Sequence, residues 1–492
     1  MIDHFFHLDF DSQRGLQEQL RESLVGAILS GIFPADEPLP SCRRLSQQLS
    51  VSRNTVALVY ESLLDSGYLQ SRPRSGYYLH PDYRGPGAPK AAAAQEERCE
   101  ERAAGAPEWG ERLKCQPRMR QGLLRPSNWM QFAYPFIYGQ PNSELFPLEQ
   151  WREASRDTLR TERNHEWIFD GVDRDDPLLI EQLRTRVLPK RGIWAEPEQI
   201  LITLGSQNAL YLLATLLMGK GTRVGMENPG YRDAWNVFDL RGADIHLQEV
   251  DGEGMRIDAR LDGCEYLYLT PGHQVPTGVT LSPERRRALL RRIEREDQIV
   301  IEDDYDAELN LDNHPQPALK AADRHGRVVY ISSLSKCLSP GLRIGYLVAD
   351  AELVAELRAL RRLMYRHPPL NNQRLLAQFL AQGNYDAHLR RFRSEHARRQ
   401  DELQRAIDSY LGGCRRISAS GAGAFWMEAP PGTDTQRLAW AAARRSVMIE
   451  TGAQHFFDGE APANCFRLGF HVLERQRIGL GIRLLAESLE QL

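Results

Sequence analysis

Five short runs rich in β-branched and aromatic residues, which alternate with helical stretches, most limit what this chain can fold into. The runs are QILITLG (199–205), RVGMENP (223–229), EYLYLTP (265–271), QIVIEDDY (298–305) and RVVYISS (327–333). Strands that alternate with helices predict a mostly parallel sheet that is covered on both faces. In such sheets, ligands bind at the carboxyl ends of the strands. Polar or special residues follow each run at once, so we expect a site at that edge.

Length and composition exclude several classes of protein. A chain of 492 residues is too long for one ordinary domain, and its hydrophobic share of 42% is normal for a globular core. No run of 18 apolar residues occurs, and the N-terminus MIDHFFHLDF lacks the order of a signal peptide, so no membrane span is expected. Seven scattered cysteines without a CxxC pair support neither disulfides nor a zinc site. We expect a cytoplasmic protein with no metal centre.

A linker divides the chain into two parts. Residues 85–108, GPGAPKAAAAQEERCEERAAGAPE, are rich in Ala, Gly, Pro and charge and poor in large apolar residues. The alternative is a surface helix through AAAAQEERCEER, and a partly helical linker satisfies both interpretations. We therefore expect a front module over residues 1–82, a linker over 83–128 and a large domain over 129–492.

The front module carries a helix-turn-helix pattern followed by a hairpin. In PLPSCRRLSQQLSVSRNTVALVYESLLDSGYLQ, Ser41 is expected to cap one helix and Ser52 a second. The inner face of the second helix is expected to hold Val56, Val59, Tyr60 and either Leu63 or Leu64. Residues at the start of such a helix contact base edges, and Arg and Asn bind guanine and adenine bidentately. The candidate DNA contacts are Arg43, Arg44, Arg53, Asn54, Thr55, Arg72, Arg74 and Gly76.

Charge is distributed unevenly over the front module. Residues 41–80 hold five arginines against Glu61 and Asp65, whereas residues 1–40 hold two arginines against seven acidic residues. A small basic face on an otherwise acidic module fits contact with a phosphate backbone. The alternative is a dimerisation or protein-binding module whose arginines are simply solvated.

The front stretch is similar to a known DNA-binding family. ILSGIFPADEPLPSCRRLSQQLSVSRNTV, YESLLDSGYL and RPRSG resemble the winged helix-turn-helix of the GntR superfamily over about residues 12–80. The resemblance implies a double-stranded DNA operator as partner. It also implies that operator-contacting positions are held by Arg43, Arg53, Thr55, Arg74 and Gly76.

The large domain places Lys336 in the turn-rich stretch ISSLSKCLSPGLRIGY. A Schiff base with pyridoxal phosphate requires an amine, an acid for the pyridine nitrogen, an aromatic plate and phosphate donors. Residues that follow the predicted strands supply each group in turn. The candidate cofactor residues are Ser206, Gln207, Tyr231, Asp303, Tyr305, Ser333, Lys336 and Arg343. Each has an ordinary alternative, since Gly-Ser precedes many helices, a loop Tyr usually packs and an acidic cluster also caps helices or binds metal.

The order of these residues resembles the fold type I aminotransferase superfamily over about residues 135–492. The matching stretches are LFPLEQW, LGSQNAL, ENPGY, TPGHQVPTG, EDDY, SLSKCLSPGLRIGY and FRLGF. The resemblance implies an α/β fold with large and small subdomains. It places Asp303 on the pyridine nitrogen, Lys336 on the cofactor aldehyde and Arg467 on a carboxylate of the substrate or effector.

Two departures from the family pattern make efficient transamination doubtful. Val275 stands where many aminotransferases have Asn before PTG. In RDDPLL, Arg174 and Leu179 replace the Tyr and Gly of the family pattern Y-x-D-P-x-G.

A GntR-type module, a linker and an aminotransferase-like domain together resemble the layout of the MocR/GabR regulators. This implies a regulator that depends on pyridoxal phosphate, senses a small amine or amino acid and forms a head-to-tail homodimer. A working aminotransferase with a DNA-binding appendage, or a regulator that senses the cofactor itself, stays open. A γ-aminobutyrate effector is not supported, because Arg232 is the only arginine close to Asp233 in the sequence.

Overall fold

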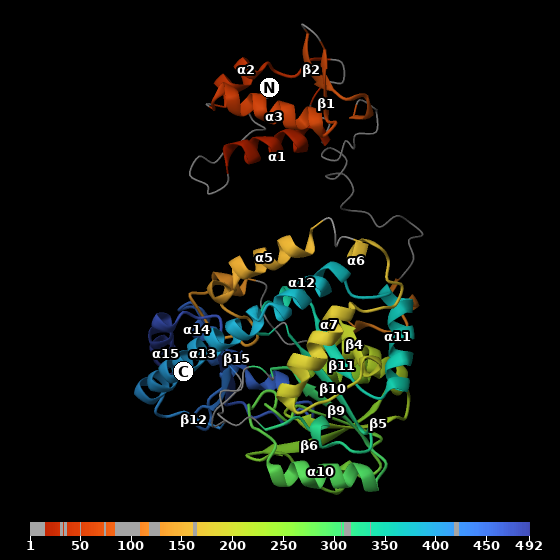
Figure 1. Ribbon diagram of the computed structural model, residues 1–492. Helices are drawn as coiled ribbons and strands as arrows, with labels where there is room; N and C mark the ends of the chain where they lie inside the picture. Colours follow the sequence, from red (N-terminus) through yellow and green to blue (C-terminus); the bar gives the residue numbers. More distant parts are fainter. Residues whose placement is uncertain are drawn as a thin grey trace. The chain divides into compact units, whose positions relative to one another are not determined.

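The computed structural model divides into two compact units, residues 1–113 and 114–492 (Figure 1). The structure describes residues 15–29, 33, 37–49, 51–72, 75–83, 109–117, 128–160, 165–306, 308, 316–334, 336–417 and 423–492. The stretch 85–108, expected as the linker, lies outside these residues, as does the candidate Arg74. A short helix, α4 (Trp109–Arg112), lies within the range that the sequence assigns to the linker.

Between Leu16 and Leu79, the described residues of the first unit form three helices and a hairpin. These are α1 (Leu16–Leu29), α2 (Cys42–Gln48), α3 (Arg53–Asp65), β1 (Leu69–Arg72) and β2 (Gly76–Leu79). Helix α2 begins because the Ser41 side chain accepts from Arg44 N, and α3 begins because the Ser52 side chain accepts from Thr55 N. Both predicted caps are therefore confirmed.

Apolar side chains from all these elements form the core of the first unit. Leu20 and Leu24 of α1 meet Val56 and Val59 of α3. The predicted inner face of α3 is confirmed, with Leu63 buried and Leu64 only half-buried. The outer surfaces of α2 and α3 are therefore open for contact.

The second unit is built around an eight-stranded sheet in the order β4-β11-β10-β9-β8-β5-β6-β7. Its strands are β4 (Ile200–Thr203), β5 (Arg223–Asn228), β6 (Asp244–Asp251), β7 (Gly254–Met255), β8 (Tyr266–Leu269), β9 (Ile299–Asp304), β10 (Val328–Ser333) and β11 (Gly345–Val348). All five predicted runs are strands of this sheet. The pairs β5·β6, β5·β8, β8·β9 and β9·β10 are parallel, so the mostly parallel sheet is confirmed.

Two strands of the sheet, β7 and β11, run antiparallel to their neighbours, and β11 is the one beside the expected site. β11 lies between β4 and β10 and is antiparallel to both. The chain reverses between Ser333 and Gly345, in the segment that contains Lys336. The turn after β10 therefore brings Lys336 and Arg343 to the sheet edge where β9 and β10 end.

Helices cover both faces of the sheet because consecutive strand residues point to opposite sides. Val329 and Ile331 of β10 pack with α8 and α11, whereas Tyr330 packs with α7 and α12 on the other face. Figure 1 shows α7, α11 and α12 around the sheet and α10 at its lower end. The α-helices of the large subdomain are α5 (Leu148–Thr158), α6 (His165–Ile168), α7 (Pro177–Gln182), α8 (Ser206–Leu217), α9 (Arg232–Leu240), α10 (Pro283–Arg295), α11 (Ala351–Tyr365) and α12 (Leu370–Ala381).

A smaller subdomain follows, with a four-stranded sheet in the order β12-β13-β16-β15. Its elements are α13 (Asn384–Tyr410), β12 (Arg415–Arg416), β13 (Ala424–Glu428), α14 (Thr435–Ala443), β14 (Val447–Met448), β15 (Glu450–Thr451), β16 (Cys465–Gly469) and α15 (Arg475–Leu489). β3 (Tyr134–Pro135) pairs with β14, so a segment from the start of the second unit packs in the small subdomain. The predicted division into large and small subdomains is thereby confirmed. No helix among the described residues has both the length and the apolarity needed to span a bilayer.

Candidate functional site

The first unit presents its predicted DNA-contacting residues on α2, α3 and the hairpin. Arg43 and Arg44 are exposed on α2, and Arg53 and Asn54 are exposed at the start of α3. Thr55 is half-buried, and its hydroxyl lies 2.8 Å from the Ser52 hydroxyl. The two arginine-bearing helix starts therefore leave their guanidinium groups in solvent.

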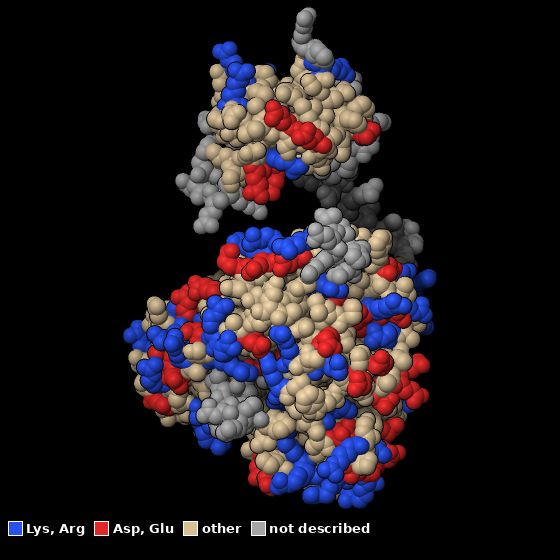
Figure 2. Space-filling model, viewed as in Figure 1, with Lys and Arg blue, Asp and Glu red and all other residues tan. Residues whose placement is uncertain are grey.

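The described part of the hairpin adds the basic side chain of Arg72. Arg72 Cζ lies 4.2 Å from the centroid of the Tyr78 ring, and Ser75 Oγ lies 2.7 Å from the Tyr78 hydroxyl. Gly76 has φ +108°, a backbone conformation that residues with a side chain rarely adopt. Figure 2 shows Lys and Arg side chains over α2 and near the end of the hairpin, which fits an anionic partner.

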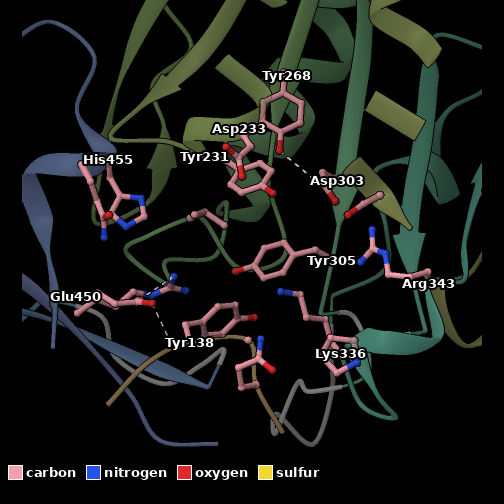
Figure 3. A pocket seen from close by; sticks show the side chains of 17 residues that line it. Tyr138, Tyr231, Asp233, Tyr268, Asp303, Tyr305, Lys336, Arg343, Glu450 and His455 are labelled. Atoms are coloured by element: carbon pink, nitrogen blue, oxygen red, sulfur yellow. Dashed lines mark hydrogen bonds and ion pairs between the residues drawn. The ribbon is translucent and has the colours of Figure 1, made fainter. Parts of the chain in front are cut away.

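The second unit has a cavity of about 370 Å³ at the carboxyl ends of its strands (Figure 3). Seven of the predicted residues line it: Ser206, Tyr231, Asp303, Tyr305, Lys336, Arg343 and Arg467. Two other predicted residues, Gln207 and Ser333, do not line the cavity. Gln207 accepts a hydrogen bond from the Tyr231 hydroxyl at 3.0 Å, and the Ser333 hydroxyl donates to the Ile344 carbonyl at 3.3 Å.

One end of the cavity is suited to an anion. Gly205 precedes α8 with φ +89°, and Arg343 Nη2 donates to the Leu204 carbonyl at 2.8 Å. A Cβ atom on Gly205 would lie 2.9 Å from Arg343 Nη2, so a larger residue would require the guanidinium to shift. Open backbone N–H groups at a helix start together with an arginine are the usual elements of a phosphate site.

Asp303 supplies an acceptor at the floor of the cavity. Its Oδ2 accepts from the Tyr268 hydroxyl at 2.9 Å, and its Oδ1 is buried without a hydrogen-bond partner among the described residues. Burial, and after it the neighbouring Asp304, raise the pKa of Asp303 to about 7 against the opposing Tyr268 hydrogen bond. A buried oxygen with no partner fits a ligand that brings an N–H group, such as a protonated pyridine ring.

Tyr138 lies close to two of the three cationic side chains of the cavity, Lys336 and Arg467. Lys336 Nζ is 4.9 Å from the centroid of its ring, and Arg467 Cζ is 3.9 Å from it. The Tyr138 hydroxyl donates to Asp306 Oδ2 at 3.3 Å, which fixes the ring. Stacking of this kind holds a guanidinium group in place without neutralising it.

Glu450 is the carboxylate nearest to Arg467 on the neighbouring strand. β15 and β16 pair so that Glu450 stands directly opposite Arg467, and Arg467 Nη1 lies 3.9 Å from Glu450 Oε2. Arg467 Nε is buried without a hydrogen-bond partner among the described residues. The guanidinium therefore keeps donor capacity for an anion in the cavity.

Sequence reasoning did not identify several residues of this cavity. Tyr268 could have been suspected, because it is a hydroxyl-bearing residue in a buried strand beside β9. Tyr138, Glu450 and His455 come from distant segments and carry no local signal. Of the two departures, Val275 lines the cavity, whereas Arg174 is exposed and Leu179 is part of the core.

Two families match the chain. The family described as aminotransferase class I and II matches residues 137–472, and the bacterial regulatory proteins of the gntR family match residues 16–79. The chain is 39% identical to the HTH-type transcriptional regulator TauR of Rhodobacter capsulatus over 99% of both chains. It is 33% identical to the probable rhizopine catabolism regulatory protein MocR of Rhizobium meliloti, over 80% of this chain and 77% of that protein.

A solved structure of an enzyme is also similar. LysN, the alpha-aminoadipate aminotransferase of Thermus thermophilus, was solved in complex with N-(5'-phosphopyridoxyl)-L-leucine. It superposes with a TM-score of 0.70 at 29% identity, over 78% of this chain and 99% of that chain.

Proposed function

The chain belongs to the helix-turn-helix regulators that join a GntR-family module to an aminotransferase class I and II domain, and on that premise we propose how its two units work. It is a DNA-binding transcription regulator, and pyridoxal phosphate is the cofactor of its second unit. The single observation that carries the proposal is the convergence of the predicted cofactor residues in one cavity of a chain that also has a DNA-binding module.

We assign the following residues to the cofactor. Lys336 would hold it covalently, Asp303 Oδ1 would accept the pyridine N–H, and the Tyr231 ring would stack on the pyridine ring. The start of α8 at Ser206 and the Arg343 guanidinium would bind the phosphate. When bound, this group supplies an aldehyde carbon that captures amines reversibly.

The effector in this proposal is a small amine or amino acid. Its amine would be directed toward Lys336, and its carboxylate toward the buried Arg467. Support comes from the Tyr138 ring, whose centroid lies 4.9 Å from Lys336 Nζ and 3.9 Å from Arg467 Cζ, because one small ligand could then reach both groups. An effector shifts operator binding only if it binds one arrangement of the protein better than another.

On the DNA side, α3 would enter the major groove with Arg53 and Asn54 toward the bases. The exposed arginines of α2 and the hairpin would bind phosphates. We further propose a head-to-tail homodimer, in which two such modules read two half-sites. The presence of one matched GntR module in the chain supports the pairing of two chains, because operators of paired modules repeat with the symmetry of the protein.

Two other functions keep support from specific observations. Lys336, Asp303 and Arg467 share one cavity, as transamination requires, so an active aminotransferase with a DNA-binding appendage remains the second candidate. The third is a regulator that responds to pyridoxal phosphate alone. It requires no carboxylate-binding residue, whereas Arg467 keeps a buried donor without a partner among the described residues.

The test is a DNA-binding titration at stated salt on genomic fragments that the purified protein selects. It compares the wild type with Lys336→Ala, with and without pyridoxal phosphate. Specific binding that depends on the cofactor or on Lys336 supports a regulator whose cofactor site is its sensor. If no fragment is selected and the protein turns over amino acids with a keto acid, the enzyme is the correct alternative.

A further inference from the structure

His455 is a buried residue of the cavity wall that cofactor binding does not use. It ends the turn Gly452–His455 that follows β15, and 1% of it is exposed. Figure 3 shows His455 and Glu450 on the side of the cavity opposite Asp303 and Arg343. His455 therefore faces ligand space on the side of Glu450, the cross-strand partner of Arg467.

The hydrogen bonds of His455 decide which of its nitrogens carries the proton. Nδ1 lies 3.3 Å from the Gly230 carbonyl oxygen, which can only accept, so Nδ1 carries the hydrogen. Nε2 is then an acceptor, and it is buried without a hydrogen-bond partner among the described residues. Burial, together with Arg467 and Arg232, lowers the pKa of His455 to about 3. The ring is therefore neutral, and Nε2 stays an acceptor near neutral pH.

The backbone around His455 holds this acceptor in a fixed position. Gly230 N donates to the His455 carbonyl at 2.9 Å. Arg232 Nε donates to the Gln454 carbonyl at 2.8 Å, and its Nη2 donates to the Phe456 carbonyl. Residues on both sides of His455 are thus clamped by one guanidinium. An acceptor held in this way can discriminate between ligands, because it cannot turn away from a ligand that fails to satisfy it.

The charges nearby restrict which donor suits Nε2. The guanidinium groups of Arg467 and Arg232 are close enough to His455 to oppose a positive charge on its ring. They therefore also oppose a cationic ligand group at the same place. A hydroxyl or an amide N–H brings the hydrogen without the charge.

We infer that His455 selects effectors that carry an uncharged hydrogen-bond donor, a hydroxyl or amide N–H, in addition to the amine and the anion. This inference rests on the proposed effector function of the cavity. A ligand with a methyl group in that place would leave a buried acceptor unpaired, and sites built for a donor discriminate strongly against such analogues. We expect the donor-bearing ligand to bind at least about 10-fold more tightly than its apolar counterpart.

The test uses the full-length protein loaded with pyridoxal phosphate and pairs of ligands matched in shape. The pairs are L-threonine with L-valine, L-asparagine with L-leucine, L-serine with L-2-aminobutyrate, and 4-amino-3-hydroxybutyrate with 4-aminobutyrate. Each is titrated while the visible absorbance of the bound cofactor reports binding. In the pair that binds most tightly, we expect the donor-bearing ligand to have the higher affinity.

Variants separate the acceptor from the shape of the ring. His455→Phe keeps a ring but removes Nε2, and we expect it to reduce the preference to less than about 3-fold by weakening the donor-bearing ligand alone. His455→Asn restores a carbonyl acceptor and is expected to recover part of the preference. His325→Phe, at an exposed histidine, is the control and should leave both affinities unchanged.

Each outcome gives a decision. Equal affinities within every pair in the wild type overturn the inference, even if the Phe variant does not fold. A preference that persists in His455→Phe overturns it as well. If no ligand in the panel changes the spectrum, the proposed effector function fails, and the inference falls with it. A spectral response without donor preference leaves the effector function intact and removes only the role of His455.

Discussion

Lys336 is the residue on which the cofactor assignment depends most directly. It follows β10 in the turn to β11, and its Nζ lies near two tyrosine rings, Tyr138 and Tyr305. We expect Lys336→Ala to lose the visible absorbance that wild type gains with pyridoxal phosphate, with an unchanged far-ultraviolet circular dichroism spectrum. Lys220→Ala, at an exposed lysine beyond the other end of α8, should keep the absorbance. A borohydride-reduced adduct mapped to any other lysine would contradict the assignment.

Asp303 should give the cofactor-free protein a measurable pH dependence. Its pKa in the folded state is about 7, above that of an unfolded Asp near 3.9, so the folded protein holds this proton over a wider range. Stability therefore falls as pH rises from about 4 to above 7. Asp303→Asn cannot titrate, so its free energy of unfolding should rise relative to wild type over that range, by on the order of 2–4 kcal/mol. Urea unfolding at several pH values measures the difference, and a constant difference would contradict the shift.

At this scale the sequence predicts some residues of the cavity and not others, for a physical reason. Asp303 lies at the end of β9 and Lys336 comes three residues after the end of β10, so their place at the sheet edge is set by local chain geometry. Tyr138 reaches the cavity only because its segment packs against residues far along the chain, as its bond to Asp306 shows. Such positions depend on tertiary packing, which one sequence does not reveal.

At the scale of elements, the strands were predictable because each is a short apolar run bounded by polar residues. The insertion of β11 between β4 and β10 was not, since strand order depends on where the turn after Lys336 sends the chain. The helix-turn-helix was predictable from its capping serines. The role of α3 as the recognition helix is open to a direct test.

α3 should carry sequence recognition through its first turn. Arg53 is exposed at the N-terminus of α3, where a helix in the major groove meets base edges. Arg53→Ala should weaken binding to a selected operator by about 1–3 kcal/mol and change binding to random DNA much less. Arg112→Ala, at an exposed arginine on α4, is the charge-matched control. Equal losses on operator and random DNA would reduce Arg53 to a phosphate contact.

For the whole molecule, the question is whether the cavity and the DNA-binding module are coupled. Each of the two units is compact on its own. A free aminotransferase with an appendage requires no coupling, whereas a regulator does. Coupling has a thermodynamic signature, because two ligands that affect each other must do so by the same factor.

We therefore expect reciprocity between operator and effector at saturating pyridoxal phosphate. An amino acid that changes the cofactor spectrum should change operator affinity by roughly 5–150-fold, and operator DNA should change the affinity for that amino acid by the same factor. Arg467→Gln should abolish this coupling for carboxylate ligands, because it removes the buried guanidinium beside Tyr138. Arg437→Gln, at an exposed arginine of α14, should leave it unchanged. Fluorescence anisotropy of labelled operator and cofactor absorbance measure the two directions. An operator affinity that responds to the cofactor alone would assign the sensing role to pyridoxal phosphate itself, and multiple turnovers without any coupling would make the second unit an enzyme.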